Sequence, residues 1–65
     1  MSEPIRIGDQ VIGIGGGWID MIAEVLEIND VASTFWVHVI NSPRNRSFEG
    51  ARYHARQNLV QRYMP

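Results

Sequence analysis

Apolar and polar residues alternate along much of this chain, and alternation with a period of two is typical of half-buried β-strands. The clearest example runs from residue 34 to residue 40, where one set of alternate side chains is apolar: Phe35, Val37 and Val39. We expect this set to face the core. The other set faces away from the core and consists of Thr34, Trp36, His38 and Ile40.

Three further segments have the character of strands. Residues 10–14 follow turn residues at 8–9 and precede a glycine loop at 15–17. Residues 46–54 are predicted to return as a strand after a hairpin loop at 41–45, with Gly50 at a bulge. Residues 60–64 are expected to close the fold after one short helical turn at 55–59.

The segment from Trp18 to Ile28 permits two interpretations. Its acidic residues recur at helical spacing, at positions 20, 24 and 27, which favours an amphipathic helix. Several other positions are β-branched, and residues 23–28 alternate once a single bulge is allowed. We favour a long bent strand and keep the helix as an alternative.

Five short strands with tight connections in 65 residues predict an all-β fold. We expect one domain over residues 1–65, a five-stranded SH3-like barrel with a short 3-10 turn near the C-terminus, because closure of a barrel protects strand edges. A helix at 18–28 would make the fold α+β instead. The chain has no cysteine, and His38 and His54 are too few for a structural zinc site, so we expect no metal and no cofactor.

The start of the chain and its apolar stretches bear on location. Residues 1–4 contain neither a basic residue nor an apolar run, unlike a secretory signal. The most apolar stretch, residues 11–28, is interrupted by acids and glycines, unlike a membrane span. Absence of cysteine fits a reducing compartment. We therefore expect a cytoplasmic protein that makes no membrane contact.

The net charge of −1 conceals a marked asymmetry along the chain. Residues 1–41 have a net charge of −5, and residues 42–65 have a net charge of +4. Every basic residue is arginine, which suits planar contacts with phosphate or carboxylate. The excess arginine permits two interpretations: a surface for an anionic partner, or strands that are neutralised by the acidic half of the same chain.

Several short sequences resemble the SH3-like barrel pattern of KOW modules. The matching segments are Gly8-Asp9-Gln10-Val11, the glycine loop after it, residues 23–30 and Val37-His38-Val39. Residues 55–60 are also similar to the 3-10 turn and last strand that close such barrels. The family pattern has a central glycine in its second strand, where this chain has Met21-Ile22-Ala23. The resemblance implies a module that binds RNA or a protein partner.

A weaker resemblance is to the type II dihydrofolate reductase barrel. Both have a Gly-Asp-x-Val start, a loop of small residues and a tryptophan. The reductase family places Val-Gln-Ile-Tyr in its central pore, whereas this chain has Gly50-Ala51-Arg52-Tyr53 and keeps only the tyrosine. We therefore expect no enzymatic activity, and retain an oligomeric enzyme only as an alternative.

The candidate binding residues combine exposed aromatic and basic side chains. An outward Trp beside arginines is suited to stacking on bases and pairing with phosphates, as in single-strand recognition. The main hypothesis is nucleic-acid binding, to RNA or DNA. The alternatives are a protein-interaction or self-assembling module, with Trp36 beneath a loop or in a homodimer seam. The candidate residues are Trp36, His38, Arg44, Arg46, Arg52, His54 and Arg56.

Overall fold

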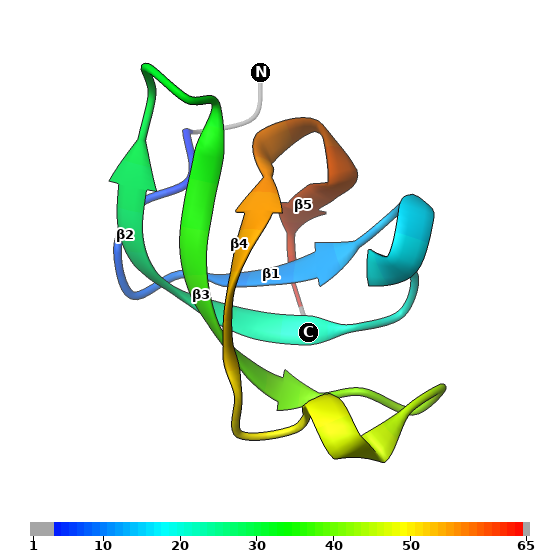
Figure 1. The fold of residues 1–65 in the computed structure, drawn as a ribbon. Coiled ribbons are helices and arrows are strands. Elements are labelled where there is room, and N and C mark those ends of the chain that lie inside the picture. The colour runs from blue at the N-terminus through cyan, green and yellow to red at the C-terminus, as the bar shows by residue number, and fades with distance from the viewer. Residues whose placement is uncertain (1–3, 65) are drawn as a thin grey trace.

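The computed structural model describes residues 4–64, and these residues form five β-strands and three short 3-10 turns without an α-helix. The strands are β1 (Gln10–Gly13), β2 (Ile22–Asn29), β3 (Thr34–Asn41), β4 (Arg52–Arg56) and β5 (Val60–Arg62). The turns are η1 (Gly16–Trp18), η2 (Arg46–Phe48) and η3 (Gln57–Leu59). The predicted all-β class is therefore confirmed (Figure 1). Residues 1–3, used above for the expectation about a secretory signal, lie outside the described residues.

The five strands form one antiparallel sheet in the order β4-β3-β2-β1-β5. The first four strands pair with their neighbours in sequence, and β5 returns to the free edge of β1, where Val60 lies opposite Gly13. In Figure 1, β1 runs across the direction of β3 and β4, and the long β2 curves between them. This curvature gives the sheet a concave face that encloses the core.

The strand β2 contains a bulge, a feature that bends its strand. Val25 pairs with Val37 and Glu27 pairs with Trp36, so Leu26 is an extra residue on its strand. The predicted bent strand with a bulge is thus confirmed over residues 22–28, and the alternative helix at 18–28 is wrong. The strand β2 pairs with β1 on one side and with β3 on the other, and this pairing determines its conformation although the acids have helical spacing.

Trp18 ends the turn η1 and residues 19–21 belong to a loop, so residues 18–21 are not part of the predicted strand. The Met21 amide donates to the Trp18 carbonyl over 3.0 Å, and the Gly13 amide donates to the Met21 carbonyl over 2.8 Å. These bonds fold the loop against the end of β1. A Cβ at Gly13 would overlap the Trp18 carbonyl, so only glycine permits this approach.

The connection between β3 and β4 is longer than the sequence predicted. Residues 46–48 form η2, where the Asn45 side chain accepts a hydrogen bond from the Ser47 amide at 3.1 Å. Gly50 has a φ of +85° and lies in a turn, not in a strand bulge. The prediction that the returning strand starts at residue 46 is therefore wrong, because Asn45 and Gly50 favour turns. The strand β4 instead continues through Arg56, and β5 ends at Arg62.

The core is built largely from small aliphatic side chains on the concave face. The predicted core residues of β3 are confirmed: Phe35 is 5% exposed, and Val37 and Val39 are 0% exposed. Neighbouring strands contribute Val11, Ala23, Val25, Ala55 and Val60. Full burial of a valine stabilises a fold by about 1.5–3 kcal/mol, so each of these positions matters in a chain of this size.

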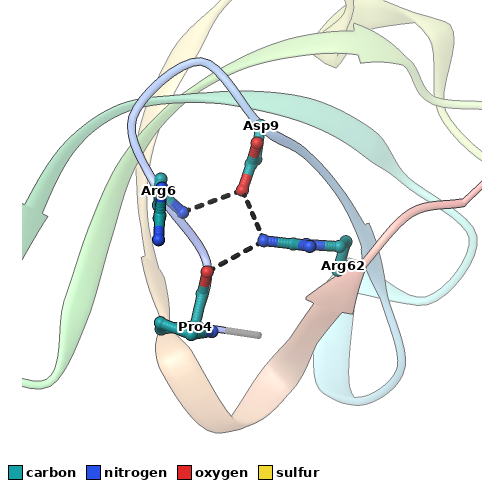
Figure 2. Close-up of polar contacts among 4 residues, drawn as sticks. All are labelled: Pro4, Arg6, Asp9 and Arg62. Atoms are coloured by element: carbon teal, nitrogen blue, oxygen red, sulfur yellow. Dashed lines mark hydrogen bonds and ion pairs between the residues drawn. The ribbon is translucent and has the colours of Figure 1, made fainter. Parts of the chain in front are cut away.

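A set of polar contacts fastens the N-terminal segment to the last strand (Figure 2). The Asp9 carboxylate oxygen Oδ2 accepts from the Arg6 backbone amide and from Arg62 Nη2, each over 2.9 Å. The same Arg62 nitrogen donates to the Pro4 carbonyl over 2.8 Å. Asp9 thereby links the turn before β1 to the end of β5.

Candidate functional site

The convex face of β2, β3 and β4 carries most of the predicted binding residues, and we call it the outer face. It is outer because these residues alternate with the core residues along each strand. The pairing of the strands arranges them in three cross-strand rows. From β2 to β4 the rows are Glu24–His38–Arg52, Glu27–Trp36–His54 and Asn29–Thr34–Arg56.

The two edges of the outer face carry charges of opposite sign. Its acidic residues lie on β2 and its arginines lie on β4, with aromatic and hydroxyl side chains on β3 between them. Adjacent strands are about 4.8 Å apart, so the backbones of Glu24 and Arg52, at the two ends of one row, are separated by roughly 10 Å. Within residues 4–64, neither Arg52 nor Arg56 makes a side-chain hydrogen bond or ion pair. Both guanidinium groups are therefore available to an anionic partner.

Trp36 and His54 form the centre of the outer face. Their ring centroids are 4.5 Å apart and the rings are tilted by 45°. Beside them is a hollow of about 390 Å³, whose far wall is the segment 27–31 at the end of β2. We call this space the Trp36 hollow. Small-molecule sites in proteins start at about 300 Å³, so the hollow has room for one aromatic ring system.

The acidic wall of the Trp36 hollow is partly occupied by internal hydrogen bonds. The Asp30 oxygen Oδ1 accepts from Gln57 Nε2 over 3.2 Å, and the Asn29 oxygen Oδ1 accepts from the Ala32 amide over 3.1 Å. The Glu27 carboxylate is exposed and has no polar partner within the described part of the chain. Glu27 is therefore the available carboxylate beside the Trp36 ring.

The structure brings together five of the predicted site residues and leaves two elsewhere. Trp36, His38, Arg52, His54 and Arg56 share the outer face. The other two, Arg44 and Arg46, lie in the loop between β3 and β4, outside the three rows.

Two of the arginines are neutralised by the acidic half of the chain. Arg44 Nε lies 3.2 Å from Asp20 Oδ2, and the two side chains are 69% and 55% exposed. Arg62 Nη2 lies 2.9 Å from Asp9 Oδ2, with side-chain exposures of 25% and 33%. Internal compensation of charge thus applies to Arg44 and Arg62, while the arginines of β4 remain outside it.

A second hollow lies on the opposite side of β4, and sequence reasoning missed it. Tyr53 alternates with the outward residues of β4 and lies edge-on to Trp18 and Phe48, at centroid distances of 6.2 and 5.6 Å. Together with Met21 and Leu59 they line a space of about 340 Å³, which we call the apolar hollow. Its residues come from η1, the loop before β2, η2, β4 and η3, so no local pattern in the sequence connects them.

The described residues offer no support for a metal or for a membrane-spanning helix. No three His, Asp or Glu side chains within residues 4–64 are grouped so that they could hold a metal ion. No helix in the same range is long and apolar enough to cross a bilayer. Gly15 precedes the three-residue turn η1, and Gly16 and Gly17 are part of it, so these glycines do not form a phosphate loop at the start of an α-helix.

Comparisons of the chain with protein-family models, with curated proteins and with solved structures found no significant match. The geometry of the residues themselves is therefore the basis for assigning a role to the outer face.

Proposed function

We propose that this chain is a small non-catalytic module that binds single-stranded nucleic acid on its outer face. The observation that carries the proposal is that the half-buried Trp36 shares the outer face with Arg52 and Arg56, two unpaired cations of the adjacent strand. An aromatic platform beside a line of cations is the combination that holds single strands, because bases stack while phosphates pair with arginine. The cysteine-free composition fits a cytoplasmic location.

The architecture supports the further proposal of an SH3-like barrel of the KOW type. The five strands and the 3-10 turn η3, which precedes the last strand β5, agree with the pattern described above. The Gly8-Asp9 pair of the matching sequence also has a structural role. Gly8 has a φ of +92°, which favours glycine, and Asp9 accepts hydrogen bonds from the Arg6 amide and from Arg62 (Figure 2).

Binding of fluorescently labelled oligouridine and oligothymidine, followed by anisotropy at low salt, tests the proposal. We expect the logarithm of affinity to fall linearly with the logarithm of salt concentration. Arg52→Gln should weaken binding and reduce the salt slope by about 0.7, the value for one phosphate contact on a single strand. Arg6→Gln is the matched control, because Arg6 is exposed and lies outside the outer face. Absence of binding at low salt, or an equal effect of both changes, contradicts the proposal.

The apolar hollow favours a second candidate function, self-association through contact with another copy of the chain. Trp18, Phe48 and Tyr53 present aromatic area of the kind that is enriched at interface centres. The acidic and basic halves of the chain also give two copies complementary charges. Sedimentation velocity tests this function. A concentration-dependent dimer that Phe48→Ser abolishes supports it, and a monomer at millimolar concentration excludes it.

Of the pore segment of the reductase family this chain keeps only Tyr53, so a reductase-like activity would depend on this residue. Because the ring of Tyr53 packs against Trp18 and Phe48 in the apolar hollow, it takes part in a packing cluster and not in an array of polar groups. We therefore propose that the chain has neither catalytic activity nor a cofactor. Calorimetric titration with folate and with a nicotinamide cofactor is the direct check, and binding of either would contradict this proposal.

A further inference from the structure

We propose that the Trp36 hollow receives a guanine base, stacked on Trp36 and recognised by the carboxylate of Glu27. This inference rests on the nucleic-acid role proposed above and adds the base that the site prefers. Glu27 lies directly opposite Trp36 in the β2–β3 register, and both residues line the hollow. A ring stacked on Trp36 therefore has its edge beside this carboxylate.

The polarity of the outer face sets the direction in which a nucleotide lies. A nucleotide has its base edge at one end and its phosphate at the other. Phosphate is repelled by the acidic side at Glu24, Glu27 and Asp30, and attracted to the side of Arg52 and Arg56. The base edge therefore points toward β2, and the sugar and phosphate lie over β4. This orientation lets the acidic wall contact the base without meeting the phosphate.

An ionised carboxylate only accepts hydrogen bonds, so it selects a base edge that donates. Guanine has two adjacent donors on its Watson–Crick edge, N1–H and the N2 amino group, and these match the two oxygens of one carboxylate. Adenine, cytosine and uracil each combine a donor with acceptors on that edge, so one oxygen of Glu27 would face an acceptor. Because Asp30 and Asn29 already accept internal hydrogen bonds, Glu27 is the residue that we assign to this recognition.

The test uses labelled six-nucleotide oligouridines in which one central residue is guanosine, inosine, adenosine or cytidine. Inosine retains N1–H and lacks the N2 amino group, so it removes one of the two expected hydrogen bonds. We expect guanosine to strengthen binding about tenfold relative to oligouridine, with inosine intermediate, since a good bidentate pair discriminates by about that factor or more.

Two matched variants test whether the guanosine preference depends on the Trp36 hollow. Glu27→Gln should abolish the guanosine preference, because the glutamine amide offers one acceptor where the carboxylate offers two. Glu24→Gln removes the same charge from the same strand and face but lies outside the Trp36 hollow, so the preference should persist. Both residues are at least partly exposed, so both variants should fold.

The outcomes separate this inference from the proposed function. Salt-dependent binding with equal affinity for all the oligonucleotides overturns guanine recognition and leaves the nucleic-acid role intact. Absence of binding to every oligonucleotide at low salt overturns both. An arginine-rich peptide that binds in their place and requires Glu27 would assign the hollow to a cationic protein partner, which also overturns the inference.

Discussion

Replacing Asp9 with asparagine is expected to destabilise the domain more than the same replacement at Asp20. The Asp9 carboxylate accepts two hydrogen bonds, one from the Arg6 amide and one from the Arg62 guanidinium, and its side chain is 33% exposed. Asparagine retains an acceptor for the amide but loses the charge that faces Arg62. Hydrogen bonds to charged groups contribute about 1.5–3 kcal/mol, and exposed ion pairs about 0–1 kcal/mol.

The partial exposure of the Asp9–Arg62 pair places the expected loss between these limits, at about 1–2 kcal/mol of unfolding free energy. A domain of this size has a total stability of roughly 3–10 kcal/mol, and each kcal/mol changes the melting temperature by about 4–8 °C. We therefore expect Asp9→Asn to lower Tm by about 4–16 °C in a calorimetric or circular-dichroism melt.

Asp20→Asn is the matched control, because its partner Arg44 is at a similar distance but both side chains are mostly exposed. Asp20 also has a φ of 67°, a conformation that asparagine adopts readily, so the backbone is not strained by the change. We expect a decrease in Tm of only a few degrees. Equal losses for the two variants would refute the reasoning that partial burial and the link to the N-terminal segment distinguish the Asp9 pair.

Further predictions concern tight packing, a buried hydroxyl and the aromatic platform. Gly13→Ala should unfold the loop 14–21 or the whole domain, whereas Gly17→Ala, in open space, should change Tm by only a few degrees; thermal melts compare them. Ser42→Ala should maintain or raise stability in urea titrations, because the Ser42 hydroxyl is buried without a partner within the described residues. Trp36→Ala should weaken oligouridine binding by about 5- to 160-fold in anisotropy titrations, since one stacked base contributes about 1–3 kcal/mol.

The strands were predictable where alternation is strong and packing agrees with it. The segment at 34–40 has one wholly apolar set of side chains, and the structure buries that set in the core. The segment at 18–28 was harder because its acids recur at helical spacing while its β-branched residues favour a strand. Its conformation is decided by pairing with β1 and β3, which are distant contacts that a local pattern does not contain.

The outer face was predictable in part and the apolar hollow was not. Alternation alone placed Trp36 and His38 on the side away from the core. The alignment of Arg52 with His38 and of His54 with Trp36 depends on the register of the β3–β4 pair. That register depends on the length of the loop between β3 and β4, and the sequence predicted a shorter loop than the structure has. The apolar hollow joins Trp18, Phe48 and Leu59, whose meeting requires the complete curved sheet.

The return of β5 to β1 has a consequence for synthesis of the protein on the ribosome. The hairpins from β1 to β4 join neighbours in sequence and can form within microseconds, while translation adds only about 5–20 residues per second. The edge of β1 nevertheless stays open until residues 60–62 have left the exit tunnel, and Asp9 lacks Arg62 until then. An open edge can pair with other chains, so this segment is most prone to aggregation just before β5 emerges. A truncation before Val60 would make that vulnerable stage permanent.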